Sequence, residues 1–378
     1  CDFQSGGTPS KNNQKFFGGD IPWITTVALK GLGIDGSDAV NWITEEAIKQ
    51  SAAKIVPANS IMIGTRIVVG KVAINLVDMS TSQDIVSLIG IDGTRWCKEY
   101  LCKCLTGKSQ YLNSQARGAT IKGIKIDTLA NLKIPEISIE KQYEVSRIID
   151  KTRIIIEQRK QELMNLNELM KARFVELFGD PVINSMGWKK ALIGDDCFVT
   201  KLAGFEYTQY INYEDSGDVV MVKAQNVKNG KLNRKELSFI SNEVSDSLPR
   251  SQLAPGDVVM TYVGANIGDV AIIDNEYKYH LAPNVAKIRP DSERYNSIYF
   301  MYMLMLLNAY IVKNSADTAK AALGMERIRK LNVFVPPMEL QNQFADFVAS
   351  VDKSKSKIQK SLEETQLLFD SLMQKYFG

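Results

Sequence analysis

The side chains in this chain that could act as nucleophiles or metal ligands are few and widely spaced. Among 378 residues there are five cysteines and one histidine, His280. Cys97, Cys102 and Cys104 lie close together, but their spacing matches no familiar zinc pairing, and one histidine cannot complete a metal cluster. We interpret the cysteines as reduced thiols that fill a core in a cytoplasmic protein. We interpret His280, within "YKYHLAPN", as a structural or surface residue at a strand end.

Motifs for cofactor chemistry are also missing from the sequence. It has no G-x-x-x-x-G-K-[ST] loop for ATP, no Asn-Pro-Pro-aromatic or Asp-Pro-Pro-aromatic run, and no glycine-rich cofactor loop for methyl transfer. No apolar run could span a bilayer, and no charged-then-apolar leader opens the sequence. A net charge of +3 permits an anionic partner without demanding one. The length and composition therefore predict a soluble protein of two or more domains, and the missing motifs argue against ATP hydrolysis and methyl transfer by this chain.

The chain repeats itself. "VPANSIMIGTRIVVGKVAIN" aligns with "LAPGDVVMTYVGANIGDVAIID", and "IKGIKIDTLANLKIP" aligns with "ALGMERIRKLNVFVP". Pro57 and Pro255, like Gly70 and Gly268, are 198 residues apart. The copies share glycines and an apolar framework but differ in most polar residues, which predicts two similar domains that recognise different things. The second copy opens with "GWKKALIGDDCFV" where the first begins at its Cys, so we expect roughly ten residues to precede Cys1.

Each copy begins with strands and ends in helices. The segments "SIMIGTRIVVGKVAIN" and "DVVMTYVGANIGDVAII" predict a strand, a tight turn and a second strand. Buried helices are predicted at "RWCKEYLCKCLTGKSQYLNSQ" and "NSIYFMYMLMLLNAYIVKN". We interpret Gly7, Gly70 and Gly268 as turn formers.

A long segment without glycine or proline closes each copy, the first running from Gln142 to Phe178. Apolar residues recur there every seven positions, with one four-residue step in the second copy that is typical of a stutter. A single apolar seam needs a partner helix, and the other copy's helix, antiparallel about a pseudo-twofold axis, is the nearest candidate. Ordinary core helices of one globule are the alternative, which the unbroken length argues against. The seam residues are Ile149, Ile156, Leu163, Met170 and Leu177, then Phe344, Val351, Ile358, Leu362, Phe369 and Tyr376.

The order of these features resembles the DNA-specificity subunit of Type I restriction-modification enzymes. The resemblance covers essentially the whole chain. It rests on "SGGTPSK…GDIPWI", "GTRIVVGKVAI", and "RGATIKGI" before a proline and a long helix, in an arrangement that occurs twice. The second copy departs from it, because "DVVMTYVGANIGDVAII" lacks the arginine and "DTAKAALGM" replaces "RGATIKGI".

The resemblance implies an α+β fold in which two similar mixed α/β target-recognition domains are joined by two long antiparallel coiled-coil helices. The expected boundaries are 1–139 for the first recognition domain, 140–179 for the first helix, 180–339 for the second domain and 340–378 for the second helix. The implied function is sequence-specific binding of double-stranded DNA with a split target, one domain per half-site, with the helix pair setting the spacing. Two methyltransferase (modification) subunits and restriction/translocase subunits would dock on the chain. They would bring S-adenosylmethionine, ATP and magnesium, and no cofactor or metal is expected in this chain.

Candidate DNA-binding residues follow from the chemistry of the ligand. Phosphate contacts need Lys, Arg, Ser, Thr or backbone amides, whereas base edges are read by Arg, Asn, Gln, Lys or carboxylates. Thr65 and Arg66 lie in a glycine-bounded hairpin turn, where the arginine could reach a guanine edge or the backbone. Any of the candidates could instead be a solvated loop residue. The candidates are Ser5, Thr8, Lys11, Thr25, Thr65, Arg66, Gln83, Arg117, Thr120 and Lys122, then Lys201, Tyr207, Lys223, Gln225, Asn226, Tyr262, Asn266, Asn284 and Lys320.

Two other function classes compete with this interpretation. A self-contained methyltransferase or nuclease carrying its own recognition domains would need catalytic motifs that the sequence lacks. A coiled-coil scaffold with heads that bind something other than DNA would explain the seam but not paired domains with divergent polar residues. A steep loss of duplex affinity with rising salt would separate DNA binding from the scaffold alternative.

Overall fold

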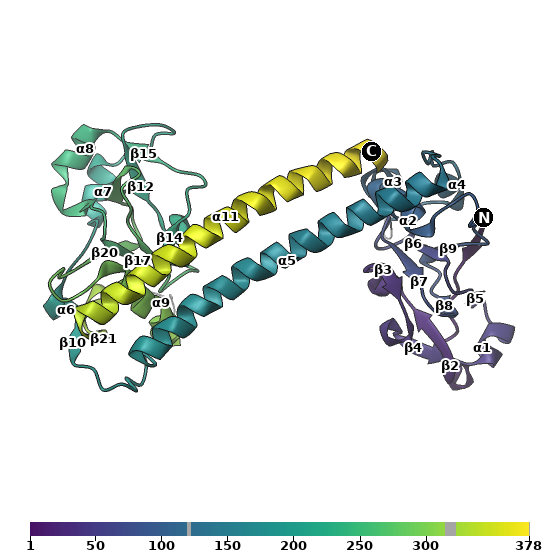
Figure 1. The fold of residues 1–378 in the computed structure, drawn as a ribbon, viewed down its shortest axis with the longest axis horizontal. Coiled ribbons are helices and arrows are strands. Elements are labelled where there is room, and N and C mark those ends of the chain that lie inside the picture. The colour runs from purple at the N-terminus through teal and green to yellow at the C-terminus, as the bar shows by residue number, and fades with distance from the viewer. Residues whose placement is uncertain (119–121, 314–322, 378) are drawn as a thin grey trace. The chain divides into compact units, whose positions relative to one another are not determined.

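The computed structural model describes residues 1–118, 122–313 and 323–377. The chain divides into two compact units (Figure 1). Unit 1 consists of residues 1–160 and 359–378, and unit 2 of residues 161–358. Each unit has two main sheets with covering helices, and each includes one half of each of two long helices, α5 (Ile139–Phe178) and α11 (Met338–Phe377).

Unit 1 begins with nine strands and several short helices. The strands are β1 (Asp2–Ser5), β2 (Phe17–Ile24), β3 (Gly31–Ile34), β4 (Asn41–Ile43), β5 (Ile55–Val56), β6 (Ile61–Gly64), β7 (Val72–Asn75), β8 (Met79–Thr81) and β9 (Ile85–Ile89). The helices are η1 (Gln14–Phe16), η2 (Thr26–Ala28), η3 (Gly36–Asp38), α1 (Glu45–Gln50), α2 (Lys98–Gly107), α3 (Ser109–Gln115) and α4 (Ile126–Ala130).

Unit 2 repeats this plan between the two long helices. Its strands are β10 (Lys190–Leu192), β11 (Cys197–Lys201), β12 (Val219–Val222), β13 (Val227–Lys228), β14 (Lys231–Leu232), β15 (Phe239–Ile240), β16 (Gln252–Leu253), β17 (Val258–Thr261), β18 (Val270–Ile272), β19 (Lys278–Leu281), β20 (Val285–Pro290) and β21 (Asn332–Phe334). Its helices are α6 (Ile193–Asp196), α7 (Gly204–Tyr210), η4 (Ala224–Asn226), α8 (Asn242–Ser247), η5 (Pro249–Ser251), α9 (Ser297–Lys313) and α10 (Met325–Arg329).

The two units share one sheet topology, except that, among the described residues, β3 of unit 1 has no counterpart in the first sheet of unit 2. In unit 1 the strand orders are β1-β9-β6-β7-β3 and β4-β2-β8-β5, and in unit 2 they are β11-β20-β17-β18 and β15-β12-β19-β16. Each second sheet contains one parallel pair, β2 with β8 and β12 with β19, among antiparallel neighbours. Topology therefore confirms the internal repeat, including non-local pairings that local sequence patterns do not show.

The central strands are apolar throughout because both of their faces are buried. In β6, Ile61 and Ile63 pack against α2 and α3, whereas Met62 between them packs toward the second sheet. In β17, Val258 and Met260 face the helices, and Val259 faces the second sheet. Alternate side chains thus enter different cores. The sequence of these strands is therefore apolar at every position and does not alternate between apolar and polar residues.

Both predicted hairpins are confirmed. Strands β6 and β7 pair antiparallel, as do β17 and β18. The predicted closing helices are also present, as α9 in unit 2 and as α2 followed by α3 in unit 1. The latter two meet at Lys108, where the helix restarts at Ser109.

The long helices α5 and α11 follow the predicted seam. Every predicted seam residue is buried or half-buried, from Ile149 to Tyr376. In unit 1 the first half of α5 packs with the last turns of α11, and in unit 2 the last half of α5 packs with the first turns of α11. The helices therefore run in opposite directions within each unit, as predicted. Gly179, at φ +76°, ends α5 in a left-handed conformation that suits glycine.

A buried glutamine fixes the start of α5 to unit 1. The side-chain amide of Gln142 donates to the carbonyls of Arg95 (3.0 Å) and Ile137 (2.8 Å). Its Oε1 accepts from the backbone N–H of Cys97 at 2.9 Å. Gln142 is fully buried, and this one side chain satisfies three backbone groups.

Gln341 makes the same three bonds in unit 2. Its amide donates to the carbonyls of Arg294 (2.9 Å) and Pro336 (2.8 Å), and its Oε1 accepts from the N–H of Asn296 at 2.8 Å. We call this arrangement, in either unit, the glutamine clamp. It explains why both copies of the repeat carry a glutamine at the beginning of the long helix.

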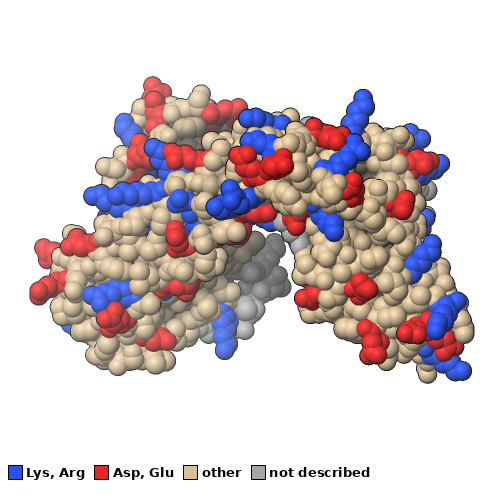
Figure 2. Space-filling model, turned by 45° about the vertical axis from the view of Figure 1, so that its right-hand side comes forward, with Lys and Arg blue, Asp and Glu red and all other residues tan. Residues whose placement is uncertain are grey.

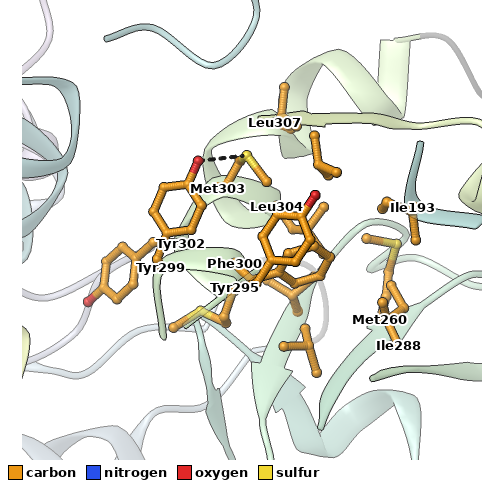
Figure 3. Packing of buried hydrophobic residues seen from close by; sticks show 14 of the residues in the cluster. Ile193, Met260, Ile288, Tyr295, Tyr299, Phe300, Tyr302, Met303, Leu304 and Leu307 are labelled. Carbon is orange, nitrogen blue, oxygen red and sulfur yellow. Dashed lines mark hydrogen bonds between the residues drawn. The ribbon is translucent and has the colours of Figure 1, made fainter. Parts of the chain in front are cut away.

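Aromatic rings join the long helices to the covering helix of each unit. In unit 2, Phe174 of α5 stacks on Tyr299 of α9 with ring centroids 5.5 Å apart, and Phe344 of α11 meets Phe174 edge-on at 5.4 Å. Figure 3 shows part of the core around Tyr299, in which residues of α9 face Met260 and Ile288 of the sheet. In unit 1, Tyr100 of α2 lies 5.4 Å from the Phe377 ring.

The predicted burial of the cysteines is confirmed for three of the five, since Cys197 is half-buried and Cys1 is exposed. Cys97, Cys102 and Cys104 are buried free thiols, and burial raises the pKa of Cys102 and of Cys104 to about 12. His280 is fully buried next to the end of β19, where its Nδ1 lies 3.0 Å from the Leu281 carbonyl oxygen. Burial lowers the pKa of His280 below its ordinary value. No helix of the described ranges is both long and apolar enough to cross a membrane.

The glutamine clamp gives the first testable prediction. In a Gln142→Ala variant, the N–H of Cys97 and two carbonyls lose their partners, which should destabilise unit 1 by about 2–4 kcal/mol. Denaturant melts of the full chain would measure this loss. Gln161→Ala, at an exposed position of the same helix, is the matched control and should change stability by less than about 0.5 kcal/mol. Equal effects of the two substitutions would show that the clamp does not hold the helix.

His280 gives a pH prediction. Its folded pKa is lowered, so below about pH 6.5 the unfolded chain binds a proton that the folded chain refuses. Its contribution to stability is therefore complete above pH 6.5 and is lost as the pH falls toward the folded pKa, at up to about 1.4 kcal/mol per pH unit. A His280→Leu variant should lose less melting temperature between pH 7.5 and pH 5.5 than the parent chain. Parallel pH profiles would contradict a buried neutral histidine.

Candidate nucleic-acid interface

One edge of unit 1 brings several candidate residues together. The connection from β8 to β9 lies at its centre, because the Ser82 N–H donates to the carbonyl of Ile24 (2.9 Å) and the Thr65 N–H donates to that of Asp84 (2.8 Å). The N–H of Gly7, after β1, donates to the Thr81 carbonyl at 2.8 Å. The loops after β1 and β2, the β8–β9 connection and the β6–β7 turn therefore adjoin one another. They carry the candidates Ser5, Thr8, Thr25, Arg66 and Gln83.

The exposure of the candidates in unit 1 varies. Ser5, Lys11, Arg66, Gln83, Arg117 and Lys122 are exposed, Thr8 and Thr25 are half-buried, and Thr65 is buried. Thr120 lies outside the described residues. Exposure at this edge is thus greatest for side chains that can reach phosphate or base edges.

A pocket of about 540 Å³ collects basic side chains beside the β6–β7 turn. Arg66 and Arg117 both bridge to Gly123, where the Arg117 N–H donates to the Gly123 carbonyl at 2.9 Å. A Cβ atom at Gly123 would lie 3.0 Å from Cγ of Arg66, so glycine permits this close approach. Lys125 adds a third cation to the lining, which we call the basic pocket.

The chemistry of the basic pocket suits an anion. Its lining consists of three cations, Gln115, Thr128, Gly123 and Ile124, and none of these described residues is acidic. Guanidinium groups bind phosphate or the O6/N7 edge of guanine through paired N–H donors. The geometry therefore fits contacts to a nucleic-acid backbone or to a purine edge.

Unit 2 forms the corresponding edge with different side chains. The N–H of Ala282 donates to the Val222 carbonyl at 3.2 Å, and the N–H of Tyr262 donates to the carbonyl of Asn284 at 2.9 Å. Tyr262 thereby occupies the place that Thr65 has in unit 1. Lys201 lies over the Tyr262 ring, with its Nζ 5.4 Å from the centroid. The edge presents a lysine and aromatic rings where unit 1 presents arginines.

A second group in unit 2 surrounds Lys223. Its Nζ donates to Oγ of Ser238 at 2.8 Å and lies 5.7 Å from the centroid of Tyr213, whose ring is 6.1 Å from that of Tyr207. Of the candidates, Lys201, Gln225, Asn266 and Asn284 are exposed, and Tyr207, Lys223 and Tyr262 are half-buried. Lys320 lies outside the described residues.

Two candidates serve the fold itself. Thr65 is 4% exposed, and its hydroxyl donates to the Asp84 carbonyl at 3.2 Å. Asn226 is 2% exposed; its amide donates to the carbonyls of Asn233 and Lys235, and its Oδ1 accepts from the N–H of Lys223. These bonds brace loops and leave neither side chain presented to a ligand.

Sequence reasoning also missed residues that line the edges. Lys125, Gln115 and Thr128 line the basic pocket, and Tyr213 lies under Lys223. Lys125 lies in the same short run as Lys122, so its charge could have identified it as a candidate from the sequence. The contact between Tyr213 and Lys223 arises only in the folded chain, and no feature of the sequence indicates it.

Charge elsewhere is mixed. Figure 2 shows Lys and Arg interspersed with Asp and Glu over the face in view, with neither sign forming a continuous field. Ion pairs along α5, such as Lys160 with Glu157 (2.8 Å) and Lys171 with Glu168 (2.8 Å), neutralise much of the helix surface. The basic pocket is thus a local feature. Among the described residues, no group of three His, Cys, Asp or Glu side chains could hold a metal ion.

Comparison with known protein sequences finds one family of domains twice in this chain. The model of the Type I restriction modification DNA specificity domain matches residues 1–165 and again residues 187–365. The MjaIX specificity subunit of Methanocaldococcus jannaschii is 25% identical over 98% of this chain and 89% of its own length. The EcoR124I/EcoR124II specificity subunit of Escherichia coli is 32% identical over 39% of this chain and 37% of its own length.

Solved structures agree on the fold. The S subunit of a Type I restriction-modification system from M. genitalium is similar over 100% of this chain and 93% of its own, with a TM-score of 0.60 and 14% identity. A chain from a study of complex assembly in a type I R-M system covers 99% of this chain and 94% of its own, with a TM-score of 0.62 and 17% identity. Because the family model matches both halves of the repeat, the chain belongs to the Type I restriction-modification DNA specificity family.

Proposed function

We propose that the chain reads a bipartite double-stranded DNA target within a Type I restriction-modification complex, one half-site per recognition domain. Membership of the family makes it a non-catalytic specificity subunit that recognises DNA. The finer assignment gives residues 1–139 and 180–339 to recognition and the helices 140–179 and 340–378 to spacing and assembly.

The observation that carries this proposal is one topology built twice with different side chains at the same edge. Arg66 and Arg117 occupy that edge in unit 1, and Lys201, Tyr262 and Lys223 occupy it in unit 2. Two frameworks that differ only in their polar loops can bind the same polymer while reading different bases. A scaffold without a nucleic-acid ligand would give no reason for this pairing.

The long helices support a role in spacing. Each is a single uninterrupted helix of 40 residues, and its seam is buried or half-buried in both units. At about 1.5 Å per residue, a helix converts sequence length into a fixed distance. We infer that the helix pair sets the number of unspecified base pairs between the half-sites.

Exposed apolar side chains on the helices support docking of partner subunits. Ile154 and Ile155 in unit 1 are 55% and 39% exposed, and Met164 and Leu169 in unit 2 are 53% and 48% exposed. Large apolar side chains grouped on one surface element mark an interaction site. We propose that methyltransferase subunits pack there, and that they and the restriction subunits supply S-adenosylmethionine, ATP and magnesium in the cytoplasm.

The assembled complex tests half-site reading. Arg66→Ala and Arg117→Ala variants should each weaken modification by roughly tenfold or more, because a bidentate base contact is worth about 1–3 kcal/mol. They should relax or weaken only one half of the methylated sequence. Lys49→Ala, an exposed position on α1, is the control and should leave the mapped site unchanged. The readout is the set of methylated positions on random-sequence DNA.

Either of two results would contradict the proposal. If changes at Arg66 altered both half-sites together, the domains would not read independently. Methylation, ATP hydrolysis or DNA cleavage by the purified chain alone would show that it is a self-contained enzyme.

A paired insertion tests the spacing role. One heptad inserted between Leu163 and Met170 and a second between Val351 and Ile358 preserve both seams, so both helices should remain folded. Each helix gains roughly 10 Å, about three base pairs of B-DNA, and the gap in the methylated site should widen accordingly. Insertion of two residues at the same places turns the seam away and should instead reduce stability. A folded, active heptad variant with the original gap would rule out the helices as the spacer.

A further inference from the structure

The tip of the β6–β7 hairpin carries an apolar residue in a backbone conformation that its side chain disfavours. Ile67 has φ +62°, and its side chain is 68% exposed. A β-branched residue in the left-handed region is a steric outlier, and the exposed two thirds of this isoleucine return no burial energy to the fold. Within unit 1, the fold therefore gains little from the identity of this side chain.

The conformation is imposed by the surrounding bonds. The Val68 N–H donates to the Arg66 carbonyl at 2.6 Å, which closes a γ-turn centred on a positive-φ residue, a rare and strained turn. Gly64 and Gly70 fix the two ends of the loop, since the Gly70 N–H donates to the Gly64 carbonyl at 2.9 Å. Such strain persists only where neighbours over-determine the backbone, and it concentrates at functional sites.

Unit 2 makes the same turn without strain on a side chain. Between Tyr262 and Ile267 it has four residues, whereas unit 1 has three between Thr65 and Val69. One of the four is Gly264, exposed at φ +116°, a conformation natural to glycine. The fold thus accepts glycine at this turn, and isoleucine in unit 1 requires another explanation.

The side chain of Ile67 borders a cavity of about 630 Å³ with Leu29, Phe369 and Met373, and most of its surface is exposed. Arg66 precedes Ile67 directly and lines the basic pocket with Arg117 and Lys125. We propose that Ile67 contacts the C5-methyl group of a thymine in the half-site read by unit 1, next to the base or phosphate held by Arg66. This inference rests on the proposed function.

The major groove accounts for both neighbours at once. It admits a two-stranded ribbon, and it alone displays the thymine methyl group and the guanine O6/N7 edge. An apolar side chain beside an arginine at a hairpin tip matches that pair of features. Wedge insertion between base pairs is the alternative, and it would not depend on a single methyl group.

Deoxyuridine provides the probe, because it pairs as thymine does but lacks the methyl group. Once the target is mapped, each thymine of the unit 1 half-site is replaced in turn, and binding by the assembled complex is measured. At one position we expect the replacement to lower the affinity of the complex for the duplex about fourfold. This is the change expected when one methyl-sized group is no longer buried. An Ile67→Gly variant should bind the thymine duplex more weakly and show a thymine-to-uracil ratio of about one at that position.

A stability readout accompanies the binding data. Because glycine accepts a positive φ, Ile67→Gly should melt at the same temperature as the parent chain or higher, even though it reads DNA less well. Asn59→Gly is the matched control, an exposed positive-φ position (φ +63°) of the same unit, and it should keep the full preference for thymine.

The outcomes separate this inference from the proposed function. If the parent complex modifies its target but shows no thymine preference at any position, the Ile67 inference alone is overturned. The inference would also be overturned if Ile67→Gly kept the preference for thymine over uracil. The same holds if Ile67→Gly lost equal affinity for the thymine and uracil duplexes at every position. Failure of the parent complex to modify any DNA would reject the proposed function and this inference with it.

Discussion

A helix with one apolar seam is unstable alone in water, and this constraint organises the whole chain. Each unit completes its core with helix segments that lie far apart in the sequence. In unit 1, Phe377 packs on Tyr100, and the chain passes so close to Gly107 that a Cβ atom there would lie 2.9 Å from the Cβ of Phe377. In unit 2, Phe344 completes the ring cluster around Phe174. Neither recognition unit is therefore a self-sufficient segment, and folding of each depends on the long helices.

The glutamine clamp complements the seam. Apolar packing is non-directional, so a seam alone lets a helix slide or rotate. Gln142 makes three hydrogen bonds and Gln341 makes a matching set. They fix the first turn of each helix to the backbone of the unit in which that helix begins. The buried amide thus supplies direction and register where the seam supplies most of the free energy. A polar residue is kept in each core because it satisfies groups that an apolar one would leave unpaired.

Sequence periodicity predicted the parts of the fold that depend on local patterns. The seam, both hairpins, and the closing helices follow from spacing and β-branched runs, and the repeat follows from matched glycines. Side-chain direction in loops does not follow from spacing. Thr65 and Arg66 are neighbours, yet one is buried and the other exposed, because the bond from Thr65 N–H to Asp84 turns the chain. The parallel pairing of β2 with β8 and the positive φ of Ile67 likewise depend on contacts distant in the sequence.

The layering of each unit separates the packing of the long helices from the loops at the edge. In unit 1 the seam packs against Tyr100 and Cys104 of α2, whereas Ile61 and Ile63 of β6 pack against Leu101 and Leu105 of the same helix. The opposite face of β6, through Met62, belongs to the core between the sheets. The edge loops carry their polar residues outside both cores, so loop substitutions need not disturb the packing that holds the helices. Sites without shared partners contribute nearly additively to stability. Loop sequence can therefore change while the packing of the long helices is retained, which is the physical basis for one framework used twice with different polar residues.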